Sequence, residues 1–135
     1  MNNAGISIPQ SFLDTTVEAF DRTIAVNLRA ALVITQVIAA DWIARRAPGV
    51  IVNLSSQASI AALADHAAYC ASKAGLDQLT RVMALELGRH NIRACAVNPT
   101  VTMTPMGRMA WGDPAKRDPM LAKIPLGRFA EPVEI

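Results

Sequence analysis

Charged residues are scarce in this sequence. Lys, Arg, Asp and Glu make up 18% of the 135 residues and leave a net charge of +2, with the two signs interspersed. There is no basic stripe of the kind that binds a phosphate backbone, so we expect no nucleic-acid partner. Apolar residues reach 52%, which is high for a soluble domain, and they need a large core or a partner surface to cover them.

Cysteine motifs, long apolar runs and leader segments are also missing. Cys70 and Cys95 lack a CxxC spacing, which favours free thiols in a reducing cytosol. Asp41, Arg45 and Arg46 break the longest apolar run before it reaches the roughly 18 residues of a membrane span. MNNAGISIP at the start has no basic segment followed by an apolar one, so it is not a signal peptide. We therefore expect a cytoplasmic protein with no membrane partner.

The distribution of apolar residues predicts alternating helices and strands. Helical spacing indicates helices over 15–47 and 67–87, and short apolar runs indicate buried strands over 50–54 and 92–97. Thr15 and Glu18 have the spacing of a capping box, and Gly88 closes the second helix. The strand at 50–54 reads as buried on both faces, which is typical of a parallel sheet built from βαβ units.

The character of the chain changes after Asn98, where six of the eight prolines lie. We expect a helix-poor segment there that covers a ligand crevice beyond the carboxyl end of a strand. Both ends read as interrupted. MNNAGIS is typical of a turn that follows a strand, and Pro132 is typical of the first residue of a helix. The sequence therefore predicts a fragment of a larger domain.

The only tyrosine of the chain, Tyr69, lies four residues before Lys73 and thirteen residues after Ser56. Residues four apart share one face of a helix, and an ammonium beside a phenol lowers the phenol's pKa. Ser56 follows the strand at 50–54, at the edge where parallel sheets place ligands. These three side chains could polarise and protonate a ketone. A lone Tyr-Lys pair at this spacing is more often an ordinary feature of a helix surface.

Several short motifs extend this pattern along the whole chain: NNAG at 2–5, VNL at 26–28, VNLSS at 52–56, YCASK at 69–73 and VNPTVTMT at 97–104. In order and spacing they resemble the short-chain dehydrogenase/reductase family. The resemblance implies an α/β fold: a doubly wound Rossmann sheet, here partial, in a single domain over 1–135. Compared with the family's complete fold, these 135 residues lack the N-terminal strands with the glycine-rich turn and the C-terminal strand. It also implies hydride transfer with a nicotinamide cofactor and no metal.

By this resemblance Asn27, Ser56, Tyr69 and Lys73 form the catalytic set. Tyr69 is the implied general acid/base, and Ser56 polarises the substrate oxygen. Lys73 is implied to lower the pKa of Tyr69 and to hold the nicotinamide ribose. Asn27 anchors a water in a proton relay, although a polar residue within a helix would mean little without this context.

The resemblance also implies residues that bind the cofactor and the substrate. The cofactor contacts are Asn3, Ala4, Gly5, Tyr69, Lys73, Pro99, Val101 and Thr104, and NADP(H) is expected more than NAD(H). The family's usual Pro-Gly is Pro99-Thr100 here, which fits a branch that reduces ketoses and dicarbonyl compounds. In that branch Ser56, Gln57, Leu63, His66 and Trp111 line the pocket of a small carbonyl or polyol substrate. His66 could instead only begin a helix, and Trp111 could only pin a loop.

Three readings of function remain open at the level of the sequence. A carbonyl or sugar reductase leads, and homodimers or homotetramers through the two long helices are expected for the full-length enzyme. A 3-oxoacyl-[acyl carrier protein] reductase or a steroid-type dehydrogenase is the second reading. The third is a non-catalytic remnant that acts as a dimerisation module, because the glycine-rich turn that cradles the pyrophosphate is missing from these residues. We expect the 135-residue chain alone to bind cofactor weakly or not at all.

Overall fold

One continuous helical stretch runs along the first third of the chain, in three parts: α1 (Val17–Ile24), a π-helical turn η1 (Ala25–Arg29) and α2 (Ala30–Ala44). The computed structural model describes residues 1–135. They form two compact units, Met1–Asn98 and Pro99–Ile135, which are described in turn. The predicted helix over 15–47 is therefore present with slightly narrower bounds.

The start of α1 is set by Thr16 and not by Thr15. The Thr16 hydroxyl accepts a hydrogen bond from the backbone N–H of Ala19, as a capping side chain does. Thr15 instead donates its hydroxyl to the carbonyl oxygen of Ser11 at 2.8 Å, within the turn that precedes the helix. The predicted capping box at Thr15 and Glu18 is wrong, because Thr16 is the cap and Ala19, three residues on, has no carboxylate to return the bond.

The sheet of the first unit contains two parallel strands, β1 (Gly49–Leu54) and β2 (Ile92–Val97), in register from Gly49 opposite Ile92 to Leu54 opposite Val97. They are joined by a 3-10 turn η2 (Gln57–Ser59), the helix α3 (Ala67–Leu87) and a 3-10 turn η3 (Gly88–His90). Asn2 adds an isolated bridge to β1 opposite Asn53. This is the parallel α/β architecture that the sequence predicts.

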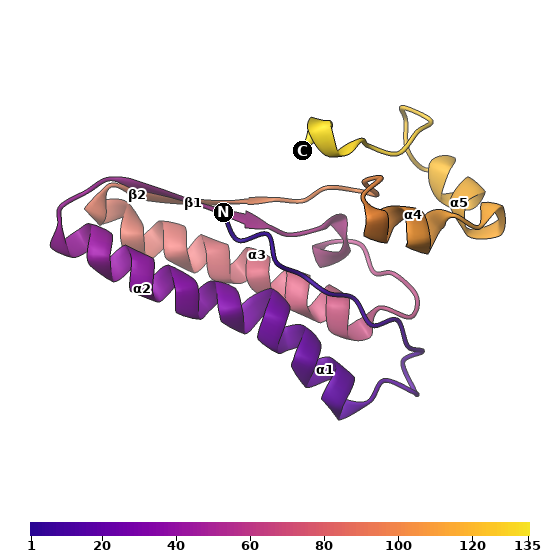
Figure 1. Ribbon diagram of the computed structural model, residues 1–135, viewed down its shortest axis with the longest axis horizontal. Helices are drawn as coiled ribbons and strands as arrows, with labels where there is room; N and C mark the ends of the chain where they lie inside the picture. The colour runs from indigo at the N-terminus through magenta and orange to yellow at the C-terminus, as the bar shows by residue number, and fades with distance from the viewer. The chain divides into compact units, whose positions relative to one another are not determined.

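The helices α1, α2 and α3 all lie on one side of the two strands (Figure 1). Burial along the strands alternates as a result. Ile51, Asn53 and Ile92 are buried, whereas Val50 and Val97 on the other face are 45% and 37% exposed. The prediction that the strand at 50–54 is buried on both faces is wrong for these residues, because no helix of this unit covers the second face.

The core lies between α2, α3 and the sheet, where Ala39, Ile51, Met83 and Ile92 form one buried cluster. Two glycines permit close contacts around it. A Cβ on Gly49 would lie 2.1 Å from the Trp42 ring, and one on Gly75 would lie 2.8 Å from Leu28. Small residues at these points let the helices and strands approach one another. The Gly75 contact brings α3, which carries Tyr69 and Lys73, close to η1, and the Gly49 contact brings β1 close to α2.

The stretch Val17–Ala44 is long and apolar enough to cross a membrane by length and composition, with a mean hydropathy of 1.7 over its most apolar 18 residues. On this criterion the predicted absence of such a segment is wrong, because Arg29 and Asp41 are too few to disqualify it. The helix also buries three polar side chains, Thr23, Asn27 and Thr35, each of them hydrogen-bonded within the first unit. Satisfied buried polar groups are typical of a helix in a protein core.

The second unit contains α4 (Pro105–Trp111), α5 (Pro114–Leu121) and a 3-10 turn η4 (Pro132–Glu134). The prediction of a helix-poor segment after Asn98 is therefore wrong. Both helices begin with a proline, and the side chains of Thr104 and Asp113 cap them. Proline is favoured at the first helical position, since its missing N–H has no partner there in any case.

Candidate functional site

Ser56 lies just beyond the carboxyl end of β1. Its backbone is still extended, and its hydroxyl oxygen accepts a hydrogen bond from the N–H of Ala58 at 3.1 Å. The side chain thereby caps η2. Because the oxygen acts as acceptor in this bond, the hydroxyl hydrogen remains available to donate to another group. This is the role that the sequence predicts for Ser56 towards a substrate oxygen.

Tyr69 and Lys73 lie one turn apart near the start of α3, as predicted. The Lys73 ammonium is 5.6 Å from the centre of the Tyr69 ring. Lys73 is only 4% exposed, and its Nζ donates to the carbonyl oxygen of Leu54 at the end of β1, at 2.7 Å. An ammonium has three N–H donors, so two remain for other acceptors.

Burial dominates the titration of both groups. It raises the pKa of the Tyr69 phenol above its ordinary value, and a hydrogen bond with Ser56 acts in the opposite direction without outweighing burial. Burial likewise lowers the pKa of Lys73, partly offset by the nearby charge of Asp77. The expected lowering of the Tyr69 pKa by Lys73 does not occur. The ammonium lies beside the ring and bonds to Leu54, so desolvation of the phenol prevails.

Asn27 lies in the π-helical turn η1, and such turns often mark functional sites. Its side chain is buried and fully engaged. Oδ1 accepts from the N–H of Ile6 at 2.8 Å, and Nδ2 donates to the Ile6 carbonyl at 2.9 Å and to the Ser72 hydroxyl at 3.0 Å. Asn27 therefore ties the N-terminal segment to the helix that carries Tyr69 and Lys73.

The predicted cofactor residues of the N-terminal turn border this group. Asn3 and Ala4 are exposed. A Cβ on Gly5 would lie 3.6 Å from both the Lys73 Nζ and the Asn27 Oδ1. Exposed backbone beside an ammonium with two spare donors fits a ribose that carries two hydroxyl groups. These residues can therefore hold the sugar of a nicotinamide nucleotide.

Three predicted substrate residues belong to the same unit. Gln57 lies in η2 directly after Ser56, and Leu63 lies in the following loop, both half-buried. His66 precedes α3, donates from Nδ1 to the Ala64 carbonyl at 2.6 Å, and meets the Tyr69 ring edge-on at 6.2 Å between ring centres. His66 thus lies beside the Tyr69 ring.

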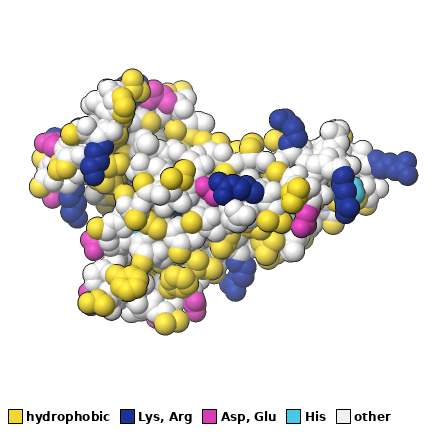
Figure 2. All heavy atoms as spheres, turned by 180° about the vertical axis from the view of Figure 1, so that it is seen from behind, with side chains coloured by type: hydrophobic (Ala, Val, Ile, Leu, Met, Phe, Trp, Pro, Cys, Tyr) yellow, Lys and Arg dark blue, Asp and Glu magenta, His cyan; other side chains and the backbone are white.

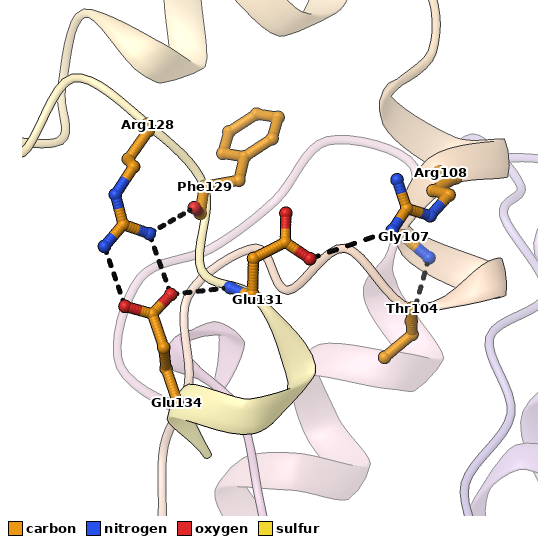
Figure 3. A network of polar contacts seen from close by, with 7 residues as sticks. All are labelled: Thr104, Gly107, Arg108, Arg128, Phe129, Glu131 and Glu134. Atoms are coloured by element: carbon orange, nitrogen blue, oxygen red, sulfur yellow. Dashed lines mark hydrogen bonds and ion pairs between the residues drawn. The ribbon is translucent and has the colours of Figure 1, made fainter.

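The remaining predicted residues, Pro99, Val101, Thr104 and Trp111, belong to the second unit. Val101 is buried, and its carbonyl accepts from the N–H of Ala130 at 3.0 Å. The Thr104 hydroxyl accepts from the N–H of Gly107 and caps α4 (Figure 3). Trp111 packs edge-on against Phe129 with ring centres 5.9 Å apart. Val101, Thr104 and Trp111 thus each have a structural role within the second unit.

A polar network lies near the end of the second unit, around η4 (Figure 3). Arg128 forms two hydrogen bonds of 2.7 Å with the carboxylate of Glu134. The N–H of Glu131 also donates to this carboxylate, at 2.7 Å. The Arg128 hydrogen bonds, followed by the one from Glu131, lower the pKa of Glu134 to about 2. The network therefore holds η4 in place at neutral pH.

Comparison with known proteins decides the family. The family model described as "Enoyl-(Acyl carrier protein) reductase" matches residues 1–135. The chain belongs to the short-chain dehydrogenase/reductase family. It is 58% identical to an L-xylulose reductase from Bos taurus over 97% of its own length and 54% of the relative. It is 54% identical to a D-erythrulose reductase from Gallus gallus, with 97% and 53% covered.

Solved structures of this short-chain dehydrogenase/reductase family confirm the fold class. The chain matches a 4-hydroxyisoleucine dehydrogenase mutant complexed with NADH and succinate, at a TM-score of 0.93 and 31% identity, over 98% of this chain and 55% of that one. It also matches a short-chain alcohol dehydrogenase from Sinorhizobium meliloti, at a TM-score of 0.92 and 33% identity, over 99% and 53%. The chain thus spans about half the length of the relatives it matches.

Sequence reasoning missed several side chains that hold the candidate site in place. Ser72, Asp77 and Asn98 all make side-chain hydrogen bonds beside it. Asp77 carried a usable signal, since it lies four residues after Lys73 and eight after Tyr69 and so shares their helix face. The others join segments distant in sequence, and no local pattern indicates them.

Proposed function

We propose that this short-chain dehydrogenase/reductase chain forms the catalytic part of an NADP(H)-dependent reductase of small ketoses and dicarbonyl compounds. The observation that carries the proposal is the grouping of Ser56, Tyr69 and Lys73 at the end of β1, with a hydroxyl hydrogen, a phenol and a buried ammonium together. The L-xylulose reductase relatives, which are 50–58% identical, support the substrate class.

In the proposed reaction Tyr69 donates its proton to the carbonyl oxygen of the substrate. Ser56 donates a hydrogen bond to the same oxygen and so favours the charge that develops there. The positive charge of Lys73 then stabilises the phenolate. A neutral phenol at working pH is the form that can act as the acid, and burial of Tyr69 favours that form.

The cofactor would lie against Asn3, Ala4 and Gly5, with Lys73 donating to its ribose. When bound, the nicotinamide supplies the hydride. A water relay at Asn27 would have to use its main-chain carbonyl, because both side-chain N–H groups already donate within the protein. We propose the second-unit residues Pro99, Val101 and Thr104 as cofactor contacts and Trp111 as a substrate contact. Gln57, Leu63 and His66 of the first unit would line the pocket of a small polyol or dicarbonyl.

NADP(H) is proposed over NAD(H) because one relative, 44% identical, is named carbonyl reductase [NADPH] 2 from Sus scrofa. A structure described as an NAD(P)-dependent gluconate 5-dehydrogenase from Beutenbergia cavernae, with bound NADP at low occupancy, matches at a TM-score of 0.93 and 30% identity. We propose a cytoplasmic enzyme that acts on small molecules.

We further propose that the full-length protein is a homodimer or homotetramer. Large apolar side chains of α2 remain exposed, among them Val33 at 51%, Ile34 at 48% and Val37 at 67%. Hydrophobic side chains are spread over the face shown in Figure 2, with charged groups scattered among them. Exposed apolar side chains gathered on one helix usually mark an interface. Sedimentation of the full-length gene product as a monomer would contradict this.

The function is tested by assaying the full-length product of the gene with L-xylulose, diacetyl and an acetoacetyl thioester, each with NADPH and with NADH. We expect turnover of the first two substrates, faster with NADPH. A clear preference for the thioester would favour an acyl-carrier reductase, which the description of the family model names. Absence of turnover with all three would favour a non-catalytic dimerisation module.

A further inference from the structure

Asp77 is a buried carboxylate that the proposed chemistry does not use. It lies on α3, one turn beyond Lys73, and only 9% of it is exposed. Its Oδ2 accepts a hydrogen bond from the Ser59 hydroxyl at 2.6 Å and another from Asn98 Nδ2 at 2.8 Å. Its Oδ1 is buried without a partner. A buried acidic group carries a desolvation cost, so its place in the fold calls for a compensating role.

The two donors connect Asp77 to the main chain of Ser56. Asn98 Nδ2 also lies 3.2 Å from the carbonyl oxygen of Ser56 and 2.9 Å from the Ser59 hydroxyl. The N–H of Ser59 donates to that same Ser56 carbonyl at 3.0 Å. The carboxylate thus anchors both ends of the η2 turn. It joins three segments: α3, the end of β2 and the loop that begins at Ser56.

We propose that Asp77 is a positioning residue which, through Asn98 and Ser59, fixes the main chain of Ser56 and so aims the Ser56 hydroxyl at the substrate oxygen. The inference rests on the proposed function, since Ser56 needs a defined direction only if it acts on a substrate. Asp77 touches neither substrate nor cofactor in this scheme.

The negative charge is what makes Asp77 suited to this role. An ionised carboxylate only accepts hydrogen bonds, so it forces the Asn98 amide to present its NH₂ group and the Ser59 hydroxyl to present its hydrogen. The Asn98 NH₂ then faces the Ser56 carbonyl as well. Burial alone would raise the pKa of Asp77, but the hydrogen bonds from Ser59 and Asn98 contribute to lowering the pKa overall. The group is therefore charged at neutral pH.

The test uses Asp77→Asn in the full-length protein, with the variant Glu86→Gln as the matched control. Glu86 is exposed on the same helix, so its variant removes the same charge without touching the network. We expect Asp77→Asn to lower kcat about 10–100-fold, because small misplacements of a catalytic group cost about that much. Cofactor affinity should stay within about threefold, and Glu86→Gln should behave as wild type.

A double variant separates positioning from general stabilisation. In a Ser56→Ala background, Asp77→Asn should cost less than about twofold, because the group that it positions is already gone. A full additional loss in that background would overturn the proposal, and would point to an effect through Lys73 or through folding. Ser59→Ala, which removes one donor at the loop side of the network, should give a smaller loss in kcat with the same masking by Ser56→Ala.

Hydrogen exchange provides a readout that does not depend on turnover. The amides of Ser59 and Ile60 donate to the carbonyl oxygens of Ser56 and Gln57. Their exchange rates should increase in Asp77→Asn and should not change in Glu86→Gln. Unchanged exchange would overturn the positioning role even in an active enzyme. If the full-length protein has no reductase activity but the exchange increases, the proposed function fails while the anchoring of this turn by Asp77 stands.

Discussion

At the scale of single residues, two opposing influences act on the Tyr69 phenol. Burial raises its pKa, and the hydrogen bond with Ser56 lowers it. The neighbouring ammonium of Lys73 is itself buried and bonds to Leu54. The phenol is therefore neutral at neutral pH, which is the form that donates a proton.

This balance can be measured, because Tyr69 is the only tyrosine of the chain. In an ultraviolet difference titration of the cofactor-free full-length protein against its Tyr69→Phe variant, we expect the phenol to ionise above pH 10, its ordinary value. The variant Ser56→Ala should raise the midpoint further, since it removes the one group that lowers the pKa. A midpoint below the ordinary value would show instead that Lys73 dominates.

At the scale of elements, the π-helical turn η1 connects the N-terminal segment to the helix that carries Tyr69 and Lys73. Asn27 is 2% exposed, and its amide satisfies both backbone groups of Ile6 as well as the Ser72 hydroxyl. This amide thus joins the N-terminal segment, η1 and α3. Removal of the amide would leave those partners buried without hydrogen bonds, which is costly.

We therefore expect Asn27→Ala to lower the free energy of unfolding of the full-length protein by about 2–4 kcal/mol, as for two or more buried polar groups left unsatisfied. Gln36→Ala is the matched control, since Gln36 is an exposed amide on α2, and it should change stability by less than about 0.5 kcal/mol. Denaturant unfolding measures both. Equal stability of the two variants would contradict a structural role for the Asn27 side chain.

The elements also show what the sequence could predict and why the rest escaped. Helical periodicity located α3, and a short apolar run located β2, with the observed bounds. The helices α4 and α5 were missed because the segment rich in proline after Asn98 was predicted to be poor in helix, whereas Pro105 and Pro114 each serve as the first residue of a capped helix. Local chemistry decides such starts, and proline content alone does not.

The candidate site likewise has a part that the sequence could predict and a part that it could not. The spacing of Ser56, Tyr69 and Lys73 follows from one strand end and one helix face, so the sequence was sufficient to bring them together. The bonds from Asn98 to Ser56 and Asp77 span 42 and 21 residues. Long-range contacts of this kind arise from the packing of α3 on β1 and β2, which periodicity cannot supply.

At the scale of the whole molecule, the chain spans about half the length of its relatives and leaves apolar surface exposed. Val50 and Val97 lie on the uncovered face of the sheet, and Val33 and Val37 lie on the outer face of α2. Burial of apolar surface is the main term that stabilises folded proteins. These faces therefore suit packing against further protein, and activity is best sought in the full-length gene product.

The most direct test of the central claim is the turnover of Tyr69→Phe in that full-length protein, with NADPH and a ketose or dicarbonyl substrate. Loss of the proton donor should lower kcat by about 10²–10⁴-fold. NADPH affinity should stay within about threefold and thermal unfolding should be unchanged, because the ring and its packing remain. A variant that kept a tenth or more of the wild-type rate would contradict the assignment of Tyr69 as the acid.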